Sequence, residues 1–231
     1  MKISVIIPCH NEEKTLETIL EQVHSSLLSL NYDYEIFIVD DGSTDKTKDI
    51  LEKIKDKYSL NILINNKKEG KGKAIQNAIK NISGDIVIIQ DADLEYDPRD
   101  YDKLTQPIIN GETNIVYGSR ILEGNNKSSN LWFYLGGIFI TKLINILFGC
   151  KLTDVTSGYK VFRTQSLEKI NLVYPDFRFC IEVTIKALKN KEKIIEIPIS
   201  YQPRTKEEGK KIRFRDGILD IISILKLRFY E

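Results

Sequence analysis

Short runs rich in isoleucine and valine alternate with amphipathic stretches along the first half of the chain. The apolar runs are ISVIIP at 3–8, YEIFIVDDG at 34–42, LNILIN at 60–65 and DIVIIQDAD at 85–93. The amphipathic stretches between them are EKTLETILEQVHSSLLSL at 13–30, TDKTKDILEKIKDKY at 44–58 and GKAIQNAIKNI at 72–82. Because this alternation is typical of a mainly parallel sheet covered by helices, the sequence predicts an α/β fold.

A polar cluster follows each of the four apolar runs. The clusters are PCHNEE, DDGSTD, NNKKEGKGK and DADLEYD, which begin at residues 8, 40, 65 and 91. Ligands of open parallel sheets bind beside the carboxyl ends of the strands. We therefore expect these four clusters to meet and to form the functional site.

The regular alternation fades after TNIVYGSR at 113–120. The remainder holds an apolar stretch at 131–149, the segment TDVTSGYKVFR at 153–163, a further helix and strand, and a basic tail. The chain contains no repeat and no low-complexity linker. One domain over residues 1–231, with a specialised part from residue 121 onward, is the simplest organisation.

Charge and cysteine content narrow the function classes. The 34 basic residues nearly balance the 33 acidic ones, and the net charge of +1 argues against a globally basic nucleic-acid binder. Any anion must then be bound locally. The three cysteines are widely spaced and odd in number, which suggests neither a disulfide framework nor a thiolate metal site. A reducing cytoplasmic compartment fits this pattern.

Three segments bear on membranes. The N-terminus reaches Pro8 and charged residues too early for a signal peptide, and the apolar stretch at 131–149 contains Lys142 and Asn145. No uncharged run reaches about 18 residues, so we predict no transmembrane span. The apolar stretch and the tail at 209–231, which joins basic residues to an Ile/Leu face, instead suggest peripheral binding to an anionic membrane surface. The alternative is that both helices only cover the sheet.

Four carboxylates fall within seven residues where the fourth apolar run stops. Asp91 and Asp93 are separated by the small Ala92, and Glu95 follows two residues later, so a turn there would bring several oxygens together. Without compensation this convergence is costly. One or two carboxylates with diphosphate oxygens are the usual ligands of Mg²⁺ or Mn²⁺. An acidic helix N-terminus would explain Asp97 but neither Asp91 nor Asp93.

The neighbouring carboxylates Asp40 and Asp41 indicate a second binding function. They repel each other unless each has a partner, and a nucleotide base or ribose supplies suitable donors. The alternative is an ordinary turn at Asp41 in which Ser43 or Thr44 caps a helix that begins near Asp45.

The chain as a whole resembles the family-two glycosyltransferases, which have the GT-A fold. The motifs that carry the resemblance are PCHNE, DDGSTD, GKGKA, DADLE, YGSR, TSGYKVFR and PRTKEEGKKI, in this order from Ile3 to about Arg228. More narrowly, the chain looks like the dolichol-phosphate mannose synthase branch. The resemblance implies an inverting enzyme that moves a sugar from a nucleotide sugar, of GDP-mannose or UDP-hexose type, to a polyprenyl phosphate such as dolichyl or undecaprenyl phosphate. It would act at the cytoplasmic face of a membrane.

The resemblance also implies roles for individual residues. The residues expected around the nucleotide are Pro8, Glu12, Asp41, Lys71, Gly72 and Asp91. Those expected to hold Mg²⁺ or Mn²⁺ are Asp91, Asp93 and Glu95. Those expected in catalysis are Asp93, Arg120, Asp154, Arg204 and Lys211, with Arg120, Arg204, Lys211 and Arg213 beside the lipid phosphate. Residues 1–120 would then form the nucleotide-sugar and metal part, and residues 121–231 the acceptor part. The exact roles of Asp154 and Ser157 stay open.

The acceptor decides between two alternatives. A phosphate monoester has a second pKa of about 6 and is already anionic at neutral pH, so it needs no strong base. The other alternative is a family-two transferase with a sugar or protein hydroxyl as acceptor, in which Asp154 or another carboxylate serves as base. Glu95, where the branch often has glutamine, and NNKSSN at 125–130, where it often has a further arginine, depart from the branch pattern.

Two other classes fit the sequence less well. A sugar-1-phosphate nucleotidyltransferase would carry a glycine-rich loop directly after the first strand, where this chain has PCHNE. A non-catalytic binding module would be favoured only if the metal carboxylates had been lost, and they are present.

Overall fold

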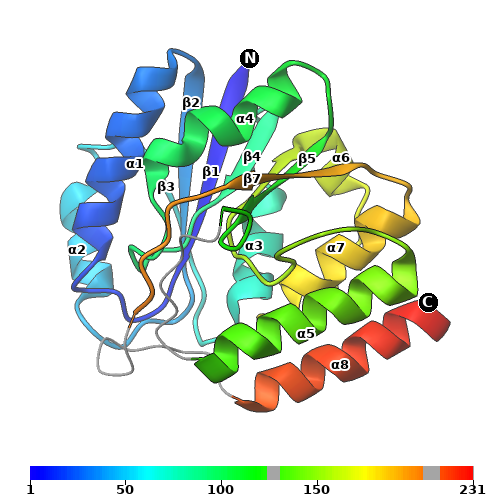
Figure 1. The fold of residues 1–231 in the computed structure, drawn as a ribbon. Helices are drawn as coiled ribbons and strands as arrows, with labels where there is room; N and C mark the ends of the chain where they lie inside the picture. Colours follow the sequence, from blue (N-terminus) through cyan, green and yellow to red (C-terminus); the bar gives the residue numbers. More distant parts are fainter. Residues whose placement is uncertain (124–130, 205–213, 231) are drawn as a thin grey trace.

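The computed structural model describes residues 1–123, 131–204 and 214–230, and within them seven strands form one sheet (Figure 1). The order of the strands across the sheet is β3-β2-β1-β4-β6-β5-β7. Their bounds are β1 Lys2–Cys9, β2 Asp33–Asp40, β3 Leu60–Ile64, β4 Ile86–Ile89, β5 Ile115–Ser119, β6 Lys160–Arg163 and β7 Ile194–Pro198. The four apolar runs of the N-terminal half form β1 to β4, as the sequence predicted.

The sheet is mixed and mainly parallel. Strand β1 pairs in parallel with β2 and β4, β2 with β3, and β5 with β7, whereas β6 lies antiparallel between β4 and β5. All four residues of β4 are buried, because helices cover both faces of the sheet at this point. This architecture confirms the predicted α/β class.

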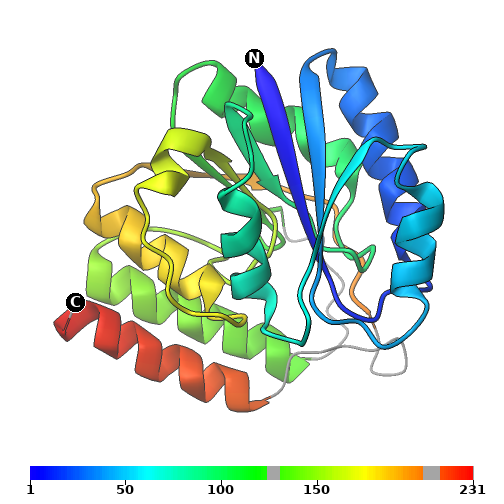
Figure 2. The same cartoon turned by 180° about the vertical axis from the view of Figure 1, so that it is seen from behind.

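Helices cover both faces of the sheet (Figures 1 and 2). Their bounds are α1 Leu16–Leu30, α2 Thr47–Ile54, α3 Lys71–Ile79, η1 Pro98–Asp100, α4 Tyr101–Ile109, α5 Leu131–Phe148, α6 Thr164–Glu168, α7 Phe179–Lys189 and α8 Phe214–Phe229. Ile3, Val5 and Ile7 pack in the core under α1, α2 and α4, whereas Ile6 packs in the core under α3 and α7. Side chains of successive residues in β1 point to opposite faces of the sheet and thus pack in two separate cores.

Helices α5 and α8 form a pair outside α7 (Figure 1). Their inner residues make a third core with α7, which includes Ile144 and Ile224. Their outer residues are apolar as well: Trp132 and Ile146 are each 80% exposed, and Phe229 is 67% exposed. None of the helices within the described ranges combines the length and the apolar character that a membrane crossing requires.

The start of α2 differs from the capping alternative considered for the second polar cluster. The helix begins at Thr47, and the Asp45 carboxylate accepts a hydrogen bond from the Thr47 amide at 3.0 Å. Ser43 makes a different contact, since its Oγ accepts a hydrogen bond from the Asn11 amide at 2.9 Å. Ser43 therefore joins two strand-end loops and does not cap the helix.

Candidate active site

The loops after β1 and β2 meet at the carboxyl ends of these strands. Cys9 and Asp40 are register partners at the end of the parallel pair. Beyond them the Thr44 amide donates to Asn11 Oδ1 at 2.8 Å, and the Glu12 amide donates to Thr47 Oγ1 at 2.9 Å. The first two polar clusters thus come together as predicted. Pro8 lies in β1 one residue before this edge, opposite Val39.

Asp41 folds the loop that follows β3. Its buried carboxylate accepts hydrogen bonds from Asn65 Nδ2 at 2.9 Å, from the Glu69 amide at 2.8 Å and from the Gly70 amide at 2.7 Å. The neighbouring Asp40 accepts from the Ser43 amide at 3.1 Å. Asp40 Oδ2 is buried without a hydrogen-bond partner, and Lys48 Nζ lies 3.9 Å from it. The protein therefore satisfies both oxygens of Asp41 and only one oxygen of Asp40.

Lys71 and Asp91 form a partly buried ion pair between the third and fourth clusters. Lys71 Nζ lies 2.5 Å from Asp91 Oδ1. Burial opposes the charge of Lys71, but the attraction of Asp91 outweighs it and the pKa of Lys71 is raised. A Cβ at Gly158 would lie 2.5 Å from Asp91 Oδ2 and 2.9 Å from Lys71 Nζ. The glycine of TSGYKVFR thus leaves the space that the ion pair occupies.

Gly72 has a packing role at the start of α3. A Cβ there would collide with the Tyr174 carbonyl oxygen and would lie 2.9 Å from the Asp176 carbonyl oxygen. The next amide, that of Lys73, donates to the Pro175 carbonyl at 2.8 Å. The segment 174–176 therefore fixes the start of α3, which carries Lys71.

Asp93 lies in an excess of negative charge. Burial raises the pKa of its carboxyl to about 7, together with the charges of Asp91 and Glu95, and Arg204 offsets only part of the shift. Leu94 adopts a left-handed conformation with φ of 62°, which turns the chain directly after Asp93. The crowding predicted for the fourth cluster is therefore present at Asp93.

The segment after β7 contacts the Glu95 carboxylate. Its two carboxylate oxygens accept hydrogen bonds from the Tyr201 hydroxyl at 3.0 Å and from the Arg204 amide at 2.8 Å. Within the described ranges no three or more His, Cys, Asp or Glu side chains are grouped so that they could hold a metal ion. The ligand set of Asp91, Asp93 and Glu95 stays a prediction, and its third member is already hydrogen-bonded to protein groups.

Arg204 crosses from the C-terminal part to the first and fourth clusters. Its Nε donates to the Asp93 carbonyl at 2.7 Å, and its Nη2 donates to Glu12 Oε2 at 3.0 Å and to Thr15 Oγ1 at 3.3 Å. Arg204 is therefore placed beside two residues predicted for the nucleotide and the metal. Lys211 and Arg213, which were predicted beside it, lie outside the described residues.

Arg120, which is partly buried, forms a second ion pair with the buried Asp154. Arg120 Nε lies 2.7 Å from Asp154 Oδ2, and Nη2 lies 2.8 Å from Oδ1, which is a two-pronged geometry. Burial alone would raise the pKa of Asp154, but Arg120 outweighs it and the pKa is lowered. The guanidinium also lies 5.1 Å from the centre of the Tyr201 ring.

Glu196 of β7 is a residue of this region that the sequence did not single out. Its carboxylate accepts hydrogen bonds from the Thr153 amide at 2.6 Å and from the Asp154 amide at 2.8 Å. The only available signal was an acidic residue within the apolar run IIEIP of a strand. Such a residue is usually assigned to a solvated face of the sheet.

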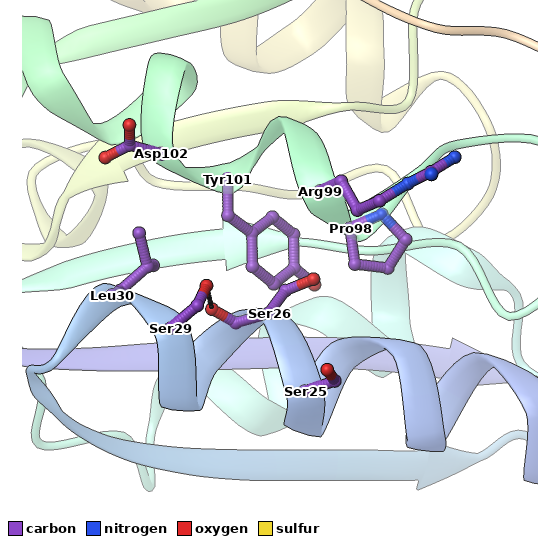
Figure 3. A pocket seen from close by; sticks show the side chains of 8 residues that line it. All are labelled: Ser25, Ser26, Ser29, Leu30, Pro98, Arg99, Tyr101 and Asp102. Carbon is purple, nitrogen blue, oxygen red and sulfur yellow. Dashed lines mark hydrogen bonds between the residues drawn. The ribbon is translucent and has the colours of Figure 1, made fainter.

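A shallow pocket of about 180 Å³ lies elsewhere, between α1 and the start of α4 (Figure 3). It is lined by Ser25, Ser26, Ser29, Leu30, Pro98, Arg99, Tyr101 and Asp102. None of these residues belongs to the predicted site. Tyr101 uses its hydroxyl for a buried hydrogen bond to Gln90 Oε1 at 3.0 Å, which is a contact within the core.

The model of the family described as Glycosyl transferase family 2 matches residues 4–171. The chain belongs to this family. A dolichol-phosphate mannosyltransferase of Pyrococcus furiosus is 32% identical over 91% of the chain. A UDP-N-acetylglucosamine–dolichyl-phosphate N-acetylglucosaminyltransferase of Methanococcus voltae is 32% identical over 97% of the chain and 96% of its own length.

Other relatives of this family-two chain are longer proteins. The chain spans 59% of the Pyrococcus furiosus enzyme and 51% of a low-salt glycan biosynthesis hexosyltransferase of Haloferax volcanii, to which it is 30% identical. A crystal structure of glucosyl-3-phosphoglycerate synthase from Mycobacterium tuberculosis, in complex with Mn²⁺, UDP and phosphoglyceric acid, covers 98% of the chain with a TM-score of 0.73 and 22% identity. The match covers 78% of that protein and confirms the GT-A fold.

Proposed function

We propose that this family-two glycosyltransferase moves a sugar from a nucleotide sugar to a polyprenyl phosphate, with inversion at the anomeric carbon. The observation that carries the acceptor class is the state of Asp154. Arg120 holds its carboxylate on both oxygens and lowers its pKa, so Asp154 is a poor proton acceptor. An anionic phosphate needs no proton removed before it attacks, whereas a hydroxyl does.

The names of the relatives support the same acceptor. Two of them are described as acting with dolichol phosphate or dolichyl phosphate, and one of these aligns over nearly its whole length. Their donors differ, since one is named for mannose and the other for N-acetylglucosamine. The donor proposed here is therefore a nucleotide sugar of GDP-mannose or UDP-hexose type.

The carboxylate cluster supports a requirement for Mg²⁺ or Mn²⁺. The carboxylates of Asp91, Asp93 and Glu95 offer oxygen ligands, which suit these hard cations. Burial together with the charges of Asp91 and Glu95 raises the pKa of Asp93, and a bound cation would offset both effects. Asp91 and Asp93 would hold the ion. When bound, the ion would stabilise the negative charge that develops on the leaving diphosphate.

The cationic side chains would act on the phosphates. Lys71 lies beside Asp91 and would act at the donor end. Arg204 contacts Asp93 and Glu12 and would act between that end and the acceptor phosphate. Arg120 and Lys211 would face the acceptor phosphate, with Arg213 nearby. Charge neutralisation of this kind lowers the barrier when two phosphate groups must approach each other.

The outer face of α5 and α8 supports peripheral membrane association. It exposes Trp132, Phe139 and Ile146 from α5, and Ile222 and Phe229 from α8. Lys226 and Arg228 are in the last turn of α8, so apolar and basic residues occur together. This combination suits the interface of an anionic leaflet, where a polyprenyl phosphate would be found.

A screen of nucleotide sugars tests the acceptor class. Purified protein is incubated with Mn²⁺, a polyprenyl phosphate and, separately, GDP-mannose, UDP-glucose or UDP-N-acetylglucosamine, and the lipid product is measured by mass. The matched control is the corresponding polyprenol, which has a hydroxyl in place of the phosphate. We expect a product with the phosphate alone. Equal transfer to the polyprenol would favour a hydroxyl acceptor and would require Asp154 to leave Arg120.

Vesicle flotation tests the membrane contact separately. The protein should float with vesicles of an anionic lipid at low salt and less so with neutral vesicles or at high salt, because attraction between charges is screened. The variant Trp132→Ser with Ile222→Ser should reduce flotation. Absence of flotation with anionic vesicles would show that α5 and α8 serve another purpose.

A further inference from the structure

Lys160 of β6 is a fully buried lysine, with 0% of its surface exposed. Its Nζ donates to the Val155 carbonyl at 3.0 Å and lies 3.3 Å from the centre of the Tyr117 ring. A buried ammonium is costly, and an apolar side chain of similar volume would fill the same space at lower cost. The packing of the core therefore does not explain why a lysine is present here.

The carbonyl that Lys160 holds belongs to the TDVTSG loop, residues 153–158. Side chains from several elements bind the backbone of this loop. Glu196 of β7 accepts from the Thr153 and Asp154 amides, Thr141 of α5 accepts from the Val155 amide at 3.2 Å, and the Tyr96 hydroxyl accepts from the Gly158 amide at 3.0 Å. These contacts use amides of the loop, whereas Lys160 binds a carbonyl.

The TDVTSG loop has one functional contact at each end. Asp154 pairs with Arg120, which is predicted to lie beside the lipid phosphate acceptor. Gly158 lies against the Lys71–Asp91 pair at the donor end. Lys160 binds the carbonyl next to Asp154 and is two residues from Gly158, so a shift of this loop would move Arg120 relative to Asp91.

We propose that Lys160 is a positioning residue that fixes the TDVTSG loop and thereby aligns Arg120 with the donor end of the site. The proposal deepens the proposed transfer reaction and rests on it. A misplacement of about 1 Å at a reacting centre can reduce a rate by about 100-fold, so loss of the Lys160 contact should be seen in turnover.

The charges around Lys160 give the proposal a second readout. Burial lowers the pKa of Lys160 to about 8, and the groups that face it are Cys180 of α7, Asp154, Glu196 of β7 and Lys71 of α3, besides the Tyr117 ring. The first three favour the ammonium and Lys71 opposes it. This pKa is still above 7, so the Lys160 ammonium is present at neutral pH. Because the pKa is lower than that of a free lysine, the charge is lost already above about pH 8.

Three variants test the proposal. Lys160→Met keeps the apolar stem and removes the donor, Lys160→Arg keeps a donor that cannot lose its charge, and Val161→Ala removes buried volume one residue away. We expect Lys160→Met to lower kcat for transfer to polyprenyl phosphate by about tenfold or more, with KM for the nucleotide sugar nearly unchanged. Its thermal midpoint should stay close to wild type, since replacing a buried charge by an apolar group is often neutral. Val161→Ala should lower the thermal midpoint and leave kcat nearly unchanged.

Lys160→Arg and the pH profile complete the test. The arginine variant should recover most of the lost turnover and should lack the decline in kcat that the wild type shows above about pH 8. If Lys160→Met transferred sugar to polyprenyl phosphate as fast as the wild type, the role of Lys160 would be overturned and the proposed function would stay intact. If the wild type does not transfer to polyprenyl phosphate at all, the proposed function fails first. If Lys160→Met and Val161→Ala lost turnover in proportion to their loss of thermal stability, the role would also be overturned.

Discussion

Asp93 and Asp154, at the two ends of the proposed site, have opposite electrostatic surroundings. At the donor end Asp93 lies near Asp91 and Glu95, and burial together with these charges raises its pKa to about 7. At the proposed acceptor end Asp154 forms an ion pair with Arg120, and the pKa of Asp154 is lowered although the residue is buried. The same side chain is thus left with surplus negative charge in one place and neutralised in the other.

The difference indicates what each end still lacks. Negative charge without an equal partner is expensive, which supports the proposal that the donor end binds a cation. At the proposed acceptor end Arg120 supplies the positive charge. A phosphate brought there would meet a guanidinium that is already oriented by Asp154.

The largest effect is expected at Asp93. Asp93→Asn should lower transfer by about a thousandfold or more, because the charge on the leaving diphosphate would no longer be stabilised through the cation. The steady-state rate with saturating Mn²⁺ measures this. Asp97→Asn is the matched control, since Asp97 accepts from the Arg99 amide at 2.9 Å and caps a short helix, a role that asparagine also fills. Activity of Asp93→Asn within tenfold of wild type, or full wild-type activity in excess EDTA, would contradict the metal proposal.

The second effect concerns the stability of the acceptor end. Asp154→Ala leaves the Arg120 guanidinium buried without its partner and should lower the free energy of unfolding by about 3–5 kcal/mol. Urea unfolding followed by circular dichroism measures the change. The double variant Arg120→Met with Asp154→Leu should recover much of that loss but no transfer. If the double variant were as active as wild type, the pair would have only a structural role.

The third effect is on the cations after β7. Arg204→Ala and Lys211→Ala should each reduce transfer to polyprenyl phosphate by about tenfold, while nucleotide-sugar binding changes little. Initial rates and calorimetric binding separate the two. The control is Arg99→Ala, because the side chain of Arg99 is 84% exposed and pairs only with Asp97 in the same turn. Since Arg204 also contacts Glu12, weaker nucleotide binding in Arg204→Ala would assign this arginine to the donor instead.

The smallest effect is a dependence of stability on pH. The pKa of Asp93 and that of Asp220 on α8 are both raised to about 7, the latter by burial and by Asp216 and Asp176. The folded protein therefore binds these protons more tightly than the unfolded chain. The stability that they contribute is present below about pH 4 and is lost as the pH rises towards 7.

Thermal unfolding between pH 5 and about 7.5 measures this loss, which should be on the order of 1 kcal/mol per group in EDTA. Mn²⁺ should abolish the pH-dependent loss of stability that comes from Asp93 and leave the loss that comes from Asp220. The variant Asp220→Asn should remove the loss that comes from Asp220. A stability that is flat over this range in EDTA would show that neither carboxyl is perturbed as described.

Local patterns in the sequence were sufficient for the N-terminal half of the sheet. Apolar runs that end in polar clusters predicted β1 to β4 and the edge at which they meet, because burial on both faces selects continuous Ile/Val segments. The crowding of Asp91 and Asp93 also followed from their spacing and was found. The boundaries of α2 were less well predicted, since Asp45 accepts from the Thr47 amide and the helix begins only there.

Only the tertiary structure decided what each carboxylate binds. Glu95 was predicted as a metal ligand from its place in the DADLE motif. Its hydrogen-bond partners Tyr201 and Arg204 lie 106 and 109 residues after it in the chain. Asp154 was predicted near the acceptor, but its neutralisation by Arg120, 34 positions away, could not be inferred from either motif. The sequence determines which residues are acidic and where the strands end, because both are local properties. Hydrogen bonds of a buried carboxylate are set by whichever distant segments pack against it, and packing is a property of the whole fold.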